Sequence, residues 1–355
     1  MVMSNFDNVF LTYANEVNPD GAGAQLHRIY GIYCLARLLG TKYLHTPLQD
    51  VYYQGLDAFQ NQSKDPTFVD AFNQRFTLPS DPTTTATPSY VSLDSIPVGR
   101  FDRAFRIQYG GRRKHLLPMR FSKFGRLVAG WSKTNAETVV RIAAPHAVMD
   151  RCANGYAICK SLSPFKKETP NGVLRIALHV RRGELMFVNS ERLIDNRYYV
   201  GVAHKLASAL AREGIPFQLE LHSELLQKDS VVRPDDPAFK GRVGEVLRLR
   251  PTQDPFGDFE VFAGLQRFIN EPTMTSIERL ATADVLVMSK SSFSYLAAIL
   301  NVAGIVLYHP FWHYPLDDWI VTKPTGDFNV RRLLEQVRSR RFNGDKARYG
   351  SPIGT

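Results

Sequence analysis

The sequence predicts an α/β protein made of two Rossmann-like, doubly wound domains that face a central cleft. Short apolar runs alternate with segments of helical period, which is the pattern of a parallel sheet with covering helices. The pattern occurs twice, on either side of a polar stretch at 164–171. The chain has 355 residues, more than one hydrophobic core ordinarily holds and enough for two. We expect domains at 1–168 and 169–328, followed by a terminal helix and basic tail at 329–355.

The first domain opens with a β-branched and aromatic run at 8–13, which predicts a strand. Turn-forming residues at 16–24 follow it. Apolar residues three and four apart then predict an amphipathic helix at 25–39, ended by Gly40. A second short strand is expected at 43–47. This order of strand, glycine turn, helix and strand is how a doubly wound sheet begins.

The middle of the first domain has a weaker pattern, with a polar loop at 83–88 and a candidate strand at 100–109. Beyond residue 171 the alternation returns. It predicts strands at 173–179, 216–222, 284–289 and 304–308, and helices at 197–213, 275–282, 293–300 and 330–338. Ligands of such sheets bind outside the carboxyl ends of the strands, so the turns that follow the strands are where site residues are expected.

The composition narrows the class of protein. A hydrophobic fraction of 44% excludes a disordered chain. Lys and Arg number 44 against 34 Asp and Glu, a formal charge of +10, which suits an anionic partner or serves solubility alone. The basic clusters at 112–115 and 331–341 lack the interleaved aromatic residues of a nucleic-acid surface. We therefore expect no nucleic-acid partner.

Cysteines and apolar runs indicate a cytoplasmic protein. Three cysteines are too few for a disulfide framework and are expected to be reduced. No basic stretch followed by an apolar run opens the sequence. The longest apolar stretch, 293–308, contains Ser294, Asn301 and Gly304 and is shorter than the ~20 residues of a membrane span. We expect no integral membrane segment.

The first candidate site is the sequence LHVRRGE at 178–184. Strand alternation puts His179 and Arg181 on one side, with Arg182 next to them. Guanidinium groups offer a planar fork for phosphate oxygens, and a following glycine allows close backbone approach. The alternative is a surface arginine pair bound to a neighbouring carboxylate.

The second candidate is a serine-rich turn between a buried strand and an apolar helix. Ser291 or Ser292 is suited to cap the helix. The same turn would direct unpaired N–H groups and the positive end of the helix dipole at an anion. Capping without any ligand is the alternative.

The third candidate is the glycine turn before the first helix, which contains Gly21, Gly23 and Gln25. It lacks the third glycine of a dinucleotide fingerprint and the lysine of a P-loop, so neither nicotinamide nor ATP binding follows. A tight turn without a ligand is the alternative.

Taken together, the GAGAQ turn, HVRRG and ADVLVMSKSSFS resemble the fucosyltransferase superfamily, above all its α1,2 and α1,6 branches. The resemblance covers about 8–45 and 172–310. It implies a GT-B architecture, with an acceptor-side first domain and a second domain that binds a nucleotide sugar. It also implies inverting, metal-independent transfer, usually from GDP-fucose, to a glycan acceptor, with no further cofactor.

The resemblance also implies roles for individual residues. Arg181 would bind the donor phosphates, with Arg182 beside it and His179 near the nucleotide. The glycine turn would face the same cleft. The remaining donor-binding residues implied are Ser291, Ser292, Phe293, Ser294, His222, Ser223 and Glu224.

The acceptor hydroxyl would benefit from a general base, for which Glu184 and Glu191 are the nearest carboxylates; either is otherwise an ordinary solvated glutamate. No cluster has metal-ligand spacing. Where some relatives place an Asp that reads guanine, this chain has Ser276, which leaves another nucleotide-sugar donor open. The alternative from a different class is a non-catalytic protein that binds a sugar or nucleotide. The sequence does not indicate an oligomeric state.

Overall fold

The computed structural model shows two compact units, each made of separate pieces of the chain. Unit 1 contains Met1–Tyr53, Pro66–Pro164 and Trp312–Asp317, and unit 2 contains Gln54–Asp65, Phe165–Phe311 and Asp318–Thr355. The domain limits drawn from the sequence stay a prediction. The residues that the structure describes are 6–14, 21–51, 67–85, 87–95, 122–134, 136–144, 160–167, 172–186, 192–225, 230–232, 247–249 and 255–348.

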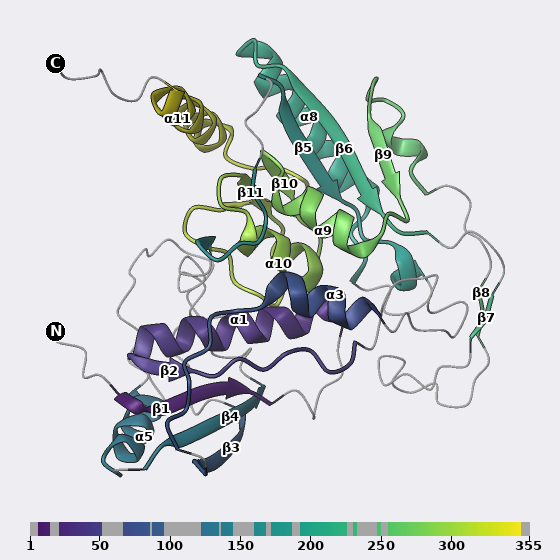
Figure 1. Ribbon diagram of the computed structural model, residues 1–355. Coiled ribbons are helices and arrows are strands. Elements are labelled where there is room, and N and C mark those ends of the chain that lie inside the picture. Colours follow the sequence, from purple (N-terminus) through teal and green to yellow (C-terminus); the bar gives the residue numbers. More distant parts are fainter. Residues whose placement is uncertain are drawn as a thin grey trace, which may run out of the picture. The chain divides into compact units, whose positions relative to one another are not determined.

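Unit 1 contains a parallel sheet of four strands in the order β2-β1-β4-β3 (Figure 1). The strands are β1 Phe6–Tyr13, β2 Thr41–Tyr43, β3 Ser89–Ser95 and β4 Thr138–Ala144. Val9, Phe10 and Leu11 of the central strand are wholly buried. This is why β1 is apolar at successive positions rather than at alternate ones.

The predicted first strand and first helix are both confirmed. Helix α1, Ala22–Leu39, ends at Gly40, whose φ of 68° is left-handed and whose N–H donates to the Ala36 carbonyl. The second strand begins and ends earlier than predicted. Past Leu44 the backbone leaves the sheet, because the His45 N–H donates to Ser80 Oγ at 3.0 Å.

Two helices of unit 1, α3 Thr67–Phe76 and α5 Ser122–Ser132, were not among the predicted elements. In α3 the rings of Phe68, Phe72 and Phe76 stack in sequence, with centroids 4.8 and 5.5 Å apart. These phenylalanines are four residues apart, so a helical signal was present in the sequence. The candidate strand at 100–109 lies outside the described residues.

Unit 2 contains a six-stranded sheet in the order β12-β11-β10-β5-β6-β9, with parallel pairing throughout. A separate antiparallel pair, β7 with β8, lies outside this sheet. The strands are β5 Leu174–His179, β6 Phe217–Ser223, β7 Ser230–Val232, β8 Leu247–Leu249, β9 Gln266–Ile269, β10 Val285–Val287, β11 Ile305–Tyr308 and β12 Ile320–Val321.

Helices cover both faces of this sheet (Figure 1). Leu174, Ile176 and Leu178 of β5 belong to the apolar core that contains the buried side chains of α8. Between them, Arg175 reaches the other face and α9. The helices are α8 Asn196–Arg212, α9 Thr273–Ala281, α10 Ser292–Leu300 and α11 Val330–Arg348, with short 3-10 helices at Gly183–Met186 and Gly257–Phe259. The predicted α/β class and the doubly wound topology of the sheet are confirmed.

Helix α11 is longer than the sequence pattern predicts. The apolar period ends near Arg338, yet the helix continues to Arg348. No helix among the described residues combines the length and apolar character that crossing a bilayer requires.

Candidate functional site

The sheet of unit 2 reverses its winding between β5 and β10. From β5 the chain continues to β6 and β9 on one side, and then returns to β10, β11 and β12 on the other side. At such a switch point the connections that leave the two neighbouring strands diverge, which opens a crevice at their carboxyl ends. The two strongest sequence motifs follow these two strands.

Arg181 and Ser291 meet at this switch point. Arg181 Nη1 donates to Ser291 Oγ at 2.8 Å, which joins the loop after β5 to the turn after β10. Arg181 is half-buried and Ser291 is fully buried. The structure therefore brings together the two motifs on which the sequence hypothesis depends. It also shows that Ser291 contacts and orients the arginine from inside the protein.

The serine-rich turn caps α10 as predicted, and Ser291 is the capping residue. Its Oγ accepts a hydrogen bond from the Phe293 N–H at 3.2 Å. Ser294 is fully buried and donates to the carbonyl oxygens of Ser289 and Ser291, at 3.3 and 3.2 Å. Ser292 and Phe293 are only half-buried. Of the four predicted residues of this turn, two are internal supports and two reach the surface.

Arg182 has a different environment from Arg181, because it is only 5% exposed. Its Nη1 donates to the Arg181 carbonyl at 2.8 Å, and its Nη2 donates to Asn196 Oδ1. Asn196 in turn donates to Asp258 Oδ2 at 2.9 Å. Burial lowers the pKa of Arg182, against the opposing effects of Tyr199 and Asp195. Arg182 thus supports the backbone that carries Arg181.

His179 closes the end of β5 as a neutral ring. Its Nδ1 lies 2.8 Å from Ser289 Oγ, and its ring centroid lies 5.8 Å from that of Phe293. Burial, together with the electrostatic effects of Arg181 and His222, lowers the pKa of His179 to about 3. At neutral pH this side chain can exchange hydrogen bonds with a ligand but adds no charge.

The predicted residues of β6 tie this strand to the loop after β5. Ser223 Oγ donates to the Val180 carbonyl at 2.5 Å, and the Gly183 N–H donates to the Glu224 carbonyl at 2.8 Å. His222 is 2% exposed, with Nε2 lying 3.2 Å from Glu220 Oε2. The structure therefore places His222 inside the unit, and Ser223 and Glu224 at the edge of the candidate site.

Of the two candidate general bases, the structure describes the backbone position of Glu184. Glu184 lies in the short 3-10 helix that follows Arg182, Gly183–Met186, at the carboxyl end of β5. Glu191 lies outside the described residues. A role for either as general base stays a prediction.

The glycine turn belongs to unit 1. Gly21 precedes α1 with an extended backbone, φ −61° and ψ 153°, and Gly23 lies in the first turn of that helix. Gln25 is buried and donates through Nε2 to the Asp50 carbonyl at 2.7 Å. Within unit 1, Gln25 therefore joins α1 to the segment that follows β2.

Several polar residues around the site were not among the predictions. They are Arg175, Asn196, Glu220, Asp258, Glu271, Arg279 and Ser289. A signal existed for Glu220, because Gln218, Glu220 and His222 alternate with leucines along one predicted strand. Polar residues on one face of a strand that lies inside a sheet need partners, and therefore indicate a buried network.

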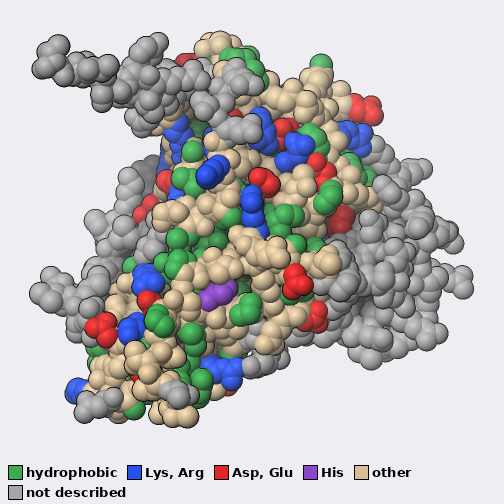
Figure 2. All heavy atoms as spheres, viewed as in Figure 1, with side chains coloured by type: hydrophobic (Ala, Val, Ile, Leu, Met, Phe, Trp, Pro, Cys, Tyr) green, Lys and Arg blue, Asp and Glu red, His purple; other side chains and the backbone are tan. Residues whose placement is uncertain are grey.

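Charge of both signs is present on the face drawn in Figure 2. On the face drawn in Figure 2, the Lys and Arg side chains of the described residues lie scattered among Asp and Glu side chains. Within the part of the chain that the structure describes, no group of three or more His, Cys, Asp or Glu is placed to hold a metal ion. At the candidate site, the guanidinium of Arg181 contacts Ser291.

No protein-family profile matches the sequence, and no curated protein matches it. Among solved structures, the chain is similar to the α1,6-fucosyltransferase NodZ of Bradyrhizobium crystallised with GDP, at 12% identity over 91% of this chain and 97% of that one, with a TM-score of 0.31. It is also similar to the ADP-heptose lipopolysaccharide heptosyltransferase II of E. coli, at 11% identity over 95% and 99%, with a TM-score of 0.34. A third is the E. coli heptosyltransferase WaaC with an ADP-heptose analogue, at 11% identity over 94% and 99%, with a TM-score of 0.35. Each of these three solved structures is a glycosyltransferase.

Proposed function

We propose that this protein is an inverting glycosyltransferase that moves fucose from GDP-fucose to a glycan hydroxyl without a metal ion. The observation that carries the proposal is the contact of Arg181 with Ser291, at the switch point of the sheet and at the first turn of α10. A guanidinium and the N–H groups of a helix start are the donors that a diphosphate requires.

The reaction breaks the bond between the anomeric carbon and the phosphate oxygen, and negative charge develops on the departing diphosphate. Arg181, held in place by Ser291 and by the Arg182 support, would stabilise that charge without having to reorganise. The acceptor oxygen forms the new bond to the anomeric carbon from the opposite side. Its proton would pass to a carboxylate, for which Glu184 and Glu191 are the candidates.

The proposal also names the nucleobase of the sugar donor, guanine. Ser276, half-buried on α9, stands where some fucosyltransferases have the Asp that reads guanine. GDP-fucose is proposed because HVRRG and SKSSFS resemble the fucosyltransferase motifs. The similar E. coli heptosyltransferases take an ADP sugar, so ADP is the first competing nucleotide to test.

The test is a thermal-shift panel of GDP, ADP, UDP and CDP in the presence of a chelator, followed by turnover assays with the matching sugars. A ligand that binds only the folded state raises the melting temperature. We expect GDP to give the largest shift in the wild-type protein. We expect Arg181→Ala to lower turnover by a factor of about 10² or more, with little change in the melting temperature of the unliganded protein.

Arg331→Ala is the matched control, because Arg331 is an exposed arginine of α11 away from the strand ends. Arg181→Lys keeps the charge and removes the planar fork, so we expect it to recover only part of the activity. Unchanged turnover in Arg181→Ala would rule out the proposed role of this site. Binding of GDP without turnover of any sugar donor would instead favour a non-catalytic nucleotide-binding protein.

A further inference from the structure

Three side chains form a hydrogen-bonded series that begins at the backbone of Arg181 and ends at the short helix that contains Asp258. Arg182 Nη1 donates to the Arg181 carbonyl at 2.8 Å, and Arg182 Nη2 donates to Asn196 Oδ1. Asn196 Nδ2 donates to Asp258 Oδ2 at 2.9 Å and to the Pro255 carbonyl at 2.5 Å. We call Arg182, Asn196 and Asp258 the support series. It connects three separate segments of unit 2.

Asn196, the central member of the support series, is half-buried in the first turn of α8. Its side-chain amide has one carbonyl oxygen and two N–H groups. The oxygen accepts from Arg182, and the N–H groups face two acceptors, on Pro255 and Asp258. A reversed amide would direct N–H groups at a guanidinium and an oxygen at a carboxylate. The neighbours therefore fix one orientation of this side chain.

Arg182 is held through uncharged acceptors. It is 5% exposed, and its two hydrogen bonds end on the Arg181 carbonyl and the Asn196 amide oxygen. Burying a charged group costs free energy unless hydrogen bonds compensate it, so both bonds matter to the position of this guanidinium. Removal of the Asn196 oxygen would leave the guanidinium with one of its two acceptors and allow it to turn away from the Arg181 carbonyl.

The other end of the support series is anchored beside the core of unit 2. Asp258 lies in a short 3-10 helix, and the nearby Phe256 and Phe259 are each 1% exposed. Both phenylalanines belong to the apolar core that contains the buried side chains of α8. Asp258 itself is exposed, so its carboxylate can be replaced without opening that core.

We propose that Asn196, supported by Asp258, is a positioning residue that orients Arg181 for an anionic ligand with two phosphate groups. Arg181 is held at both ends, because Ser291 contacts its guanidinium and Arg182 contacts its carbonyl. Asn196 acts on Arg181 through Arg182 and does not touch the ligand. An arginine that is already oriented need not be ordered when the ligand binds, which increases affinity. The identity of the ligand as a nucleoside diphosphate rests on the proposed function above.

The first test compares Asn196→Ala with Asn329→Ala by calorimetry, with pyrophosphate as the ligand. Both asparagines lie at the start of a helix, and Asn329 Oδ1 accepts a hydrogen bond from the Arg332 N–H at 3.1 Å. We expect Asn196→Ala to bind pyrophosphate about tenfold more weakly, because a small displacement of a positioned group is costly. Asn329→Ala loses a helix cap, so it should lower the melting temperature and keep the wild-type affinity.

The second test changes only the exposed end of the support series. Asp258→Asn keeps an oxygen that accepts from Asn196, whereas Asp258→Ala removes it. We expect Asp258→Ala to bind pyrophosphate about threefold more weakly, and Asp258→Asn to match the wild-type protein. Both variants should keep the wild-type melting temperature, so a difference in their affinities reports positioning and not loss of folded protein. This pair decides the question if Asn196→Ala does not fold.

The third test asks whether Asn196 acts through Arg181. GDP affinity is measured in Arg181→Ala and in the double variant with Asn196→Ala. We expect the second substitution to cause no further loss of affinity, because two residues that act as one unit are not additive. A further tenfold loss would overturn the proposal, since the effect of Asn196 would then not pass through Arg181.

Wild-type affinity for pyrophosphate in both Asn196→Ala and Asp258→Ala would also overturn the positioning role, even in a protein that transfers a sugar. The expected losses without turnover of any sugar donor would uphold the positioning role while the proposed function fails. A wild-type protein that binds neither pyrophosphate nor a nucleoside diphosphate would overturn both. The two failures are therefore distinguishable.

Discussion

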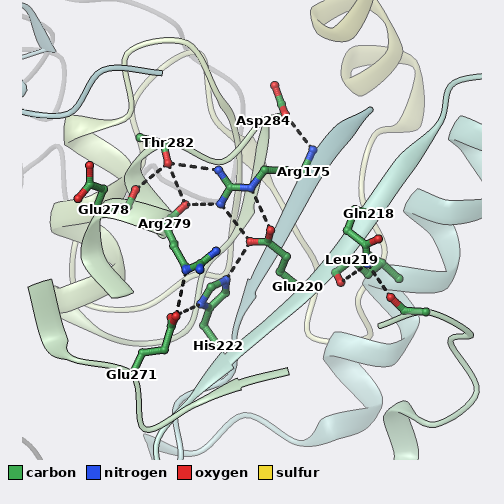
Figure 3. Close-up of polar contacts among 11 residues, drawn as sticks. Arg175, Gln218, Leu219, Glu220, His222, Glu271, Glu278, Arg279, Thr282 and Asp284 are labelled. Carbon is green, nitrogen blue, oxygen red and sulfur yellow. Dashed lines mark hydrogen bonds and ion pairs between the residues drawn. The ribbon is translucent and has the colours of Figure 1, made fainter. Parts of the chain in front are cut away.

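Each unit contains a buried, ionised glutamate, and the two are held by different kinds of partner. In unit 1, Glu137 accepts hydrogen bonds from the N–H and hydroxyl groups of Thr84 and Thr85 at 2.7–3.0 Å. In unit 2, Glu220 is held by the Arg175 guanidinium and by the His222 ring (Figure 3). The pKa of each glutamate is lowered to about 2. One carboxylate fixes a loop, while the other joins β5 to β6 through Arg175.

The largest effect is expected when the charge of each glutamate is removed. Glu220→Gln leaves the Arg175 guanidinium without its counter-charge, so we expect a loss of about 3 kcal/mol in the free energy of unfolding. Glu137→Gln leaves only neutral donors, to which the amide oxygen can still bind, so its loss should be clearly smaller. Urea unfolding of both variants measures the difference. Equal losses would mean that burial alone, and not the charge of the partners, decides the contribution of each glutamate.

A smaller effect is expected from acid. The pKa of each glutamate is lower in the folded state than the ordinary value of 4.5. Each therefore contributes stability that is fully present above about pH 4.5 and is lost as the pH falls toward 2. We expect the melting temperature of the wild-type protein to fall over that interval, and Glu137→Gln to show a shallower fall. A variant with the slope of the wild-type protein would contradict the low pKa of Glu137.

The smallest effect on stability is expected at the glycine turn of unit 1. Gly21 has φ −61°, and a Cβ added there would meet nothing within 4 Å. Gly21→Ala should therefore leave the free energy of unfolding nearly unchanged. Gly40→Ala, at the other end of α1, should cost about 1 kcal/mol because its φ of 68° suits glycine.

Gly21→Ala also tests whether unit 1 contributes to binding of the sugar donor. If the glycine turn approaches the donor closely, as its sequence motif predicts, Gly21→Ala should raise the KM for the sugar donor at unchanged stability. A variant with the wild-type KM would leave the turn a purely local structure. The two units would then differ more clearly, because the residues that bind the donor would all belong to unit 2.

Much of unit 2 could be predicted from the sequence because its strands β5, β10 and β11 are largely buried. Successive apolar residues in β5, β10 and β11 stand out against the polar turns around them. The strand β3 gives no such signal, since Tyr90 is 64% exposed and no side chain at 89–94 is fully buried. Its place in the sheet depends on pairing with β4, which is a long-range property of the fold.

The candidate site could be predicted in part because its residues follow strands with a clear apolar pattern. Arg181 and Ser291 follow buried strands, so the parallel pairing of those strands brings them to one edge. The separate roles of Arg181 and Arg182 could not be read, because adjacent arginines look alike until the fold buries one of them. The contacts of Arg175 with Glu220 and with the Arg279 carbonyl depend on strand register and on how α9 packs, neither of which a local pattern contains.

The passage of Trp312–Asp317 into unit 1 has a consequence for how the protein can be divided. On one side of this passage His313 packs against His27, with ring centroids 4.3 Å apart, and on the other Trp319 packs against Tyr295 at 5.3 Å. A single cut in the sequence would therefore leave each fragment with hydrophobic surface that its missing piece normally covers. During synthesis, unit 1 receives its last piece only after most of unit 2 has emerged from the ribosome. A chimera with a relative would need junctions on both sides of this hexapeptide.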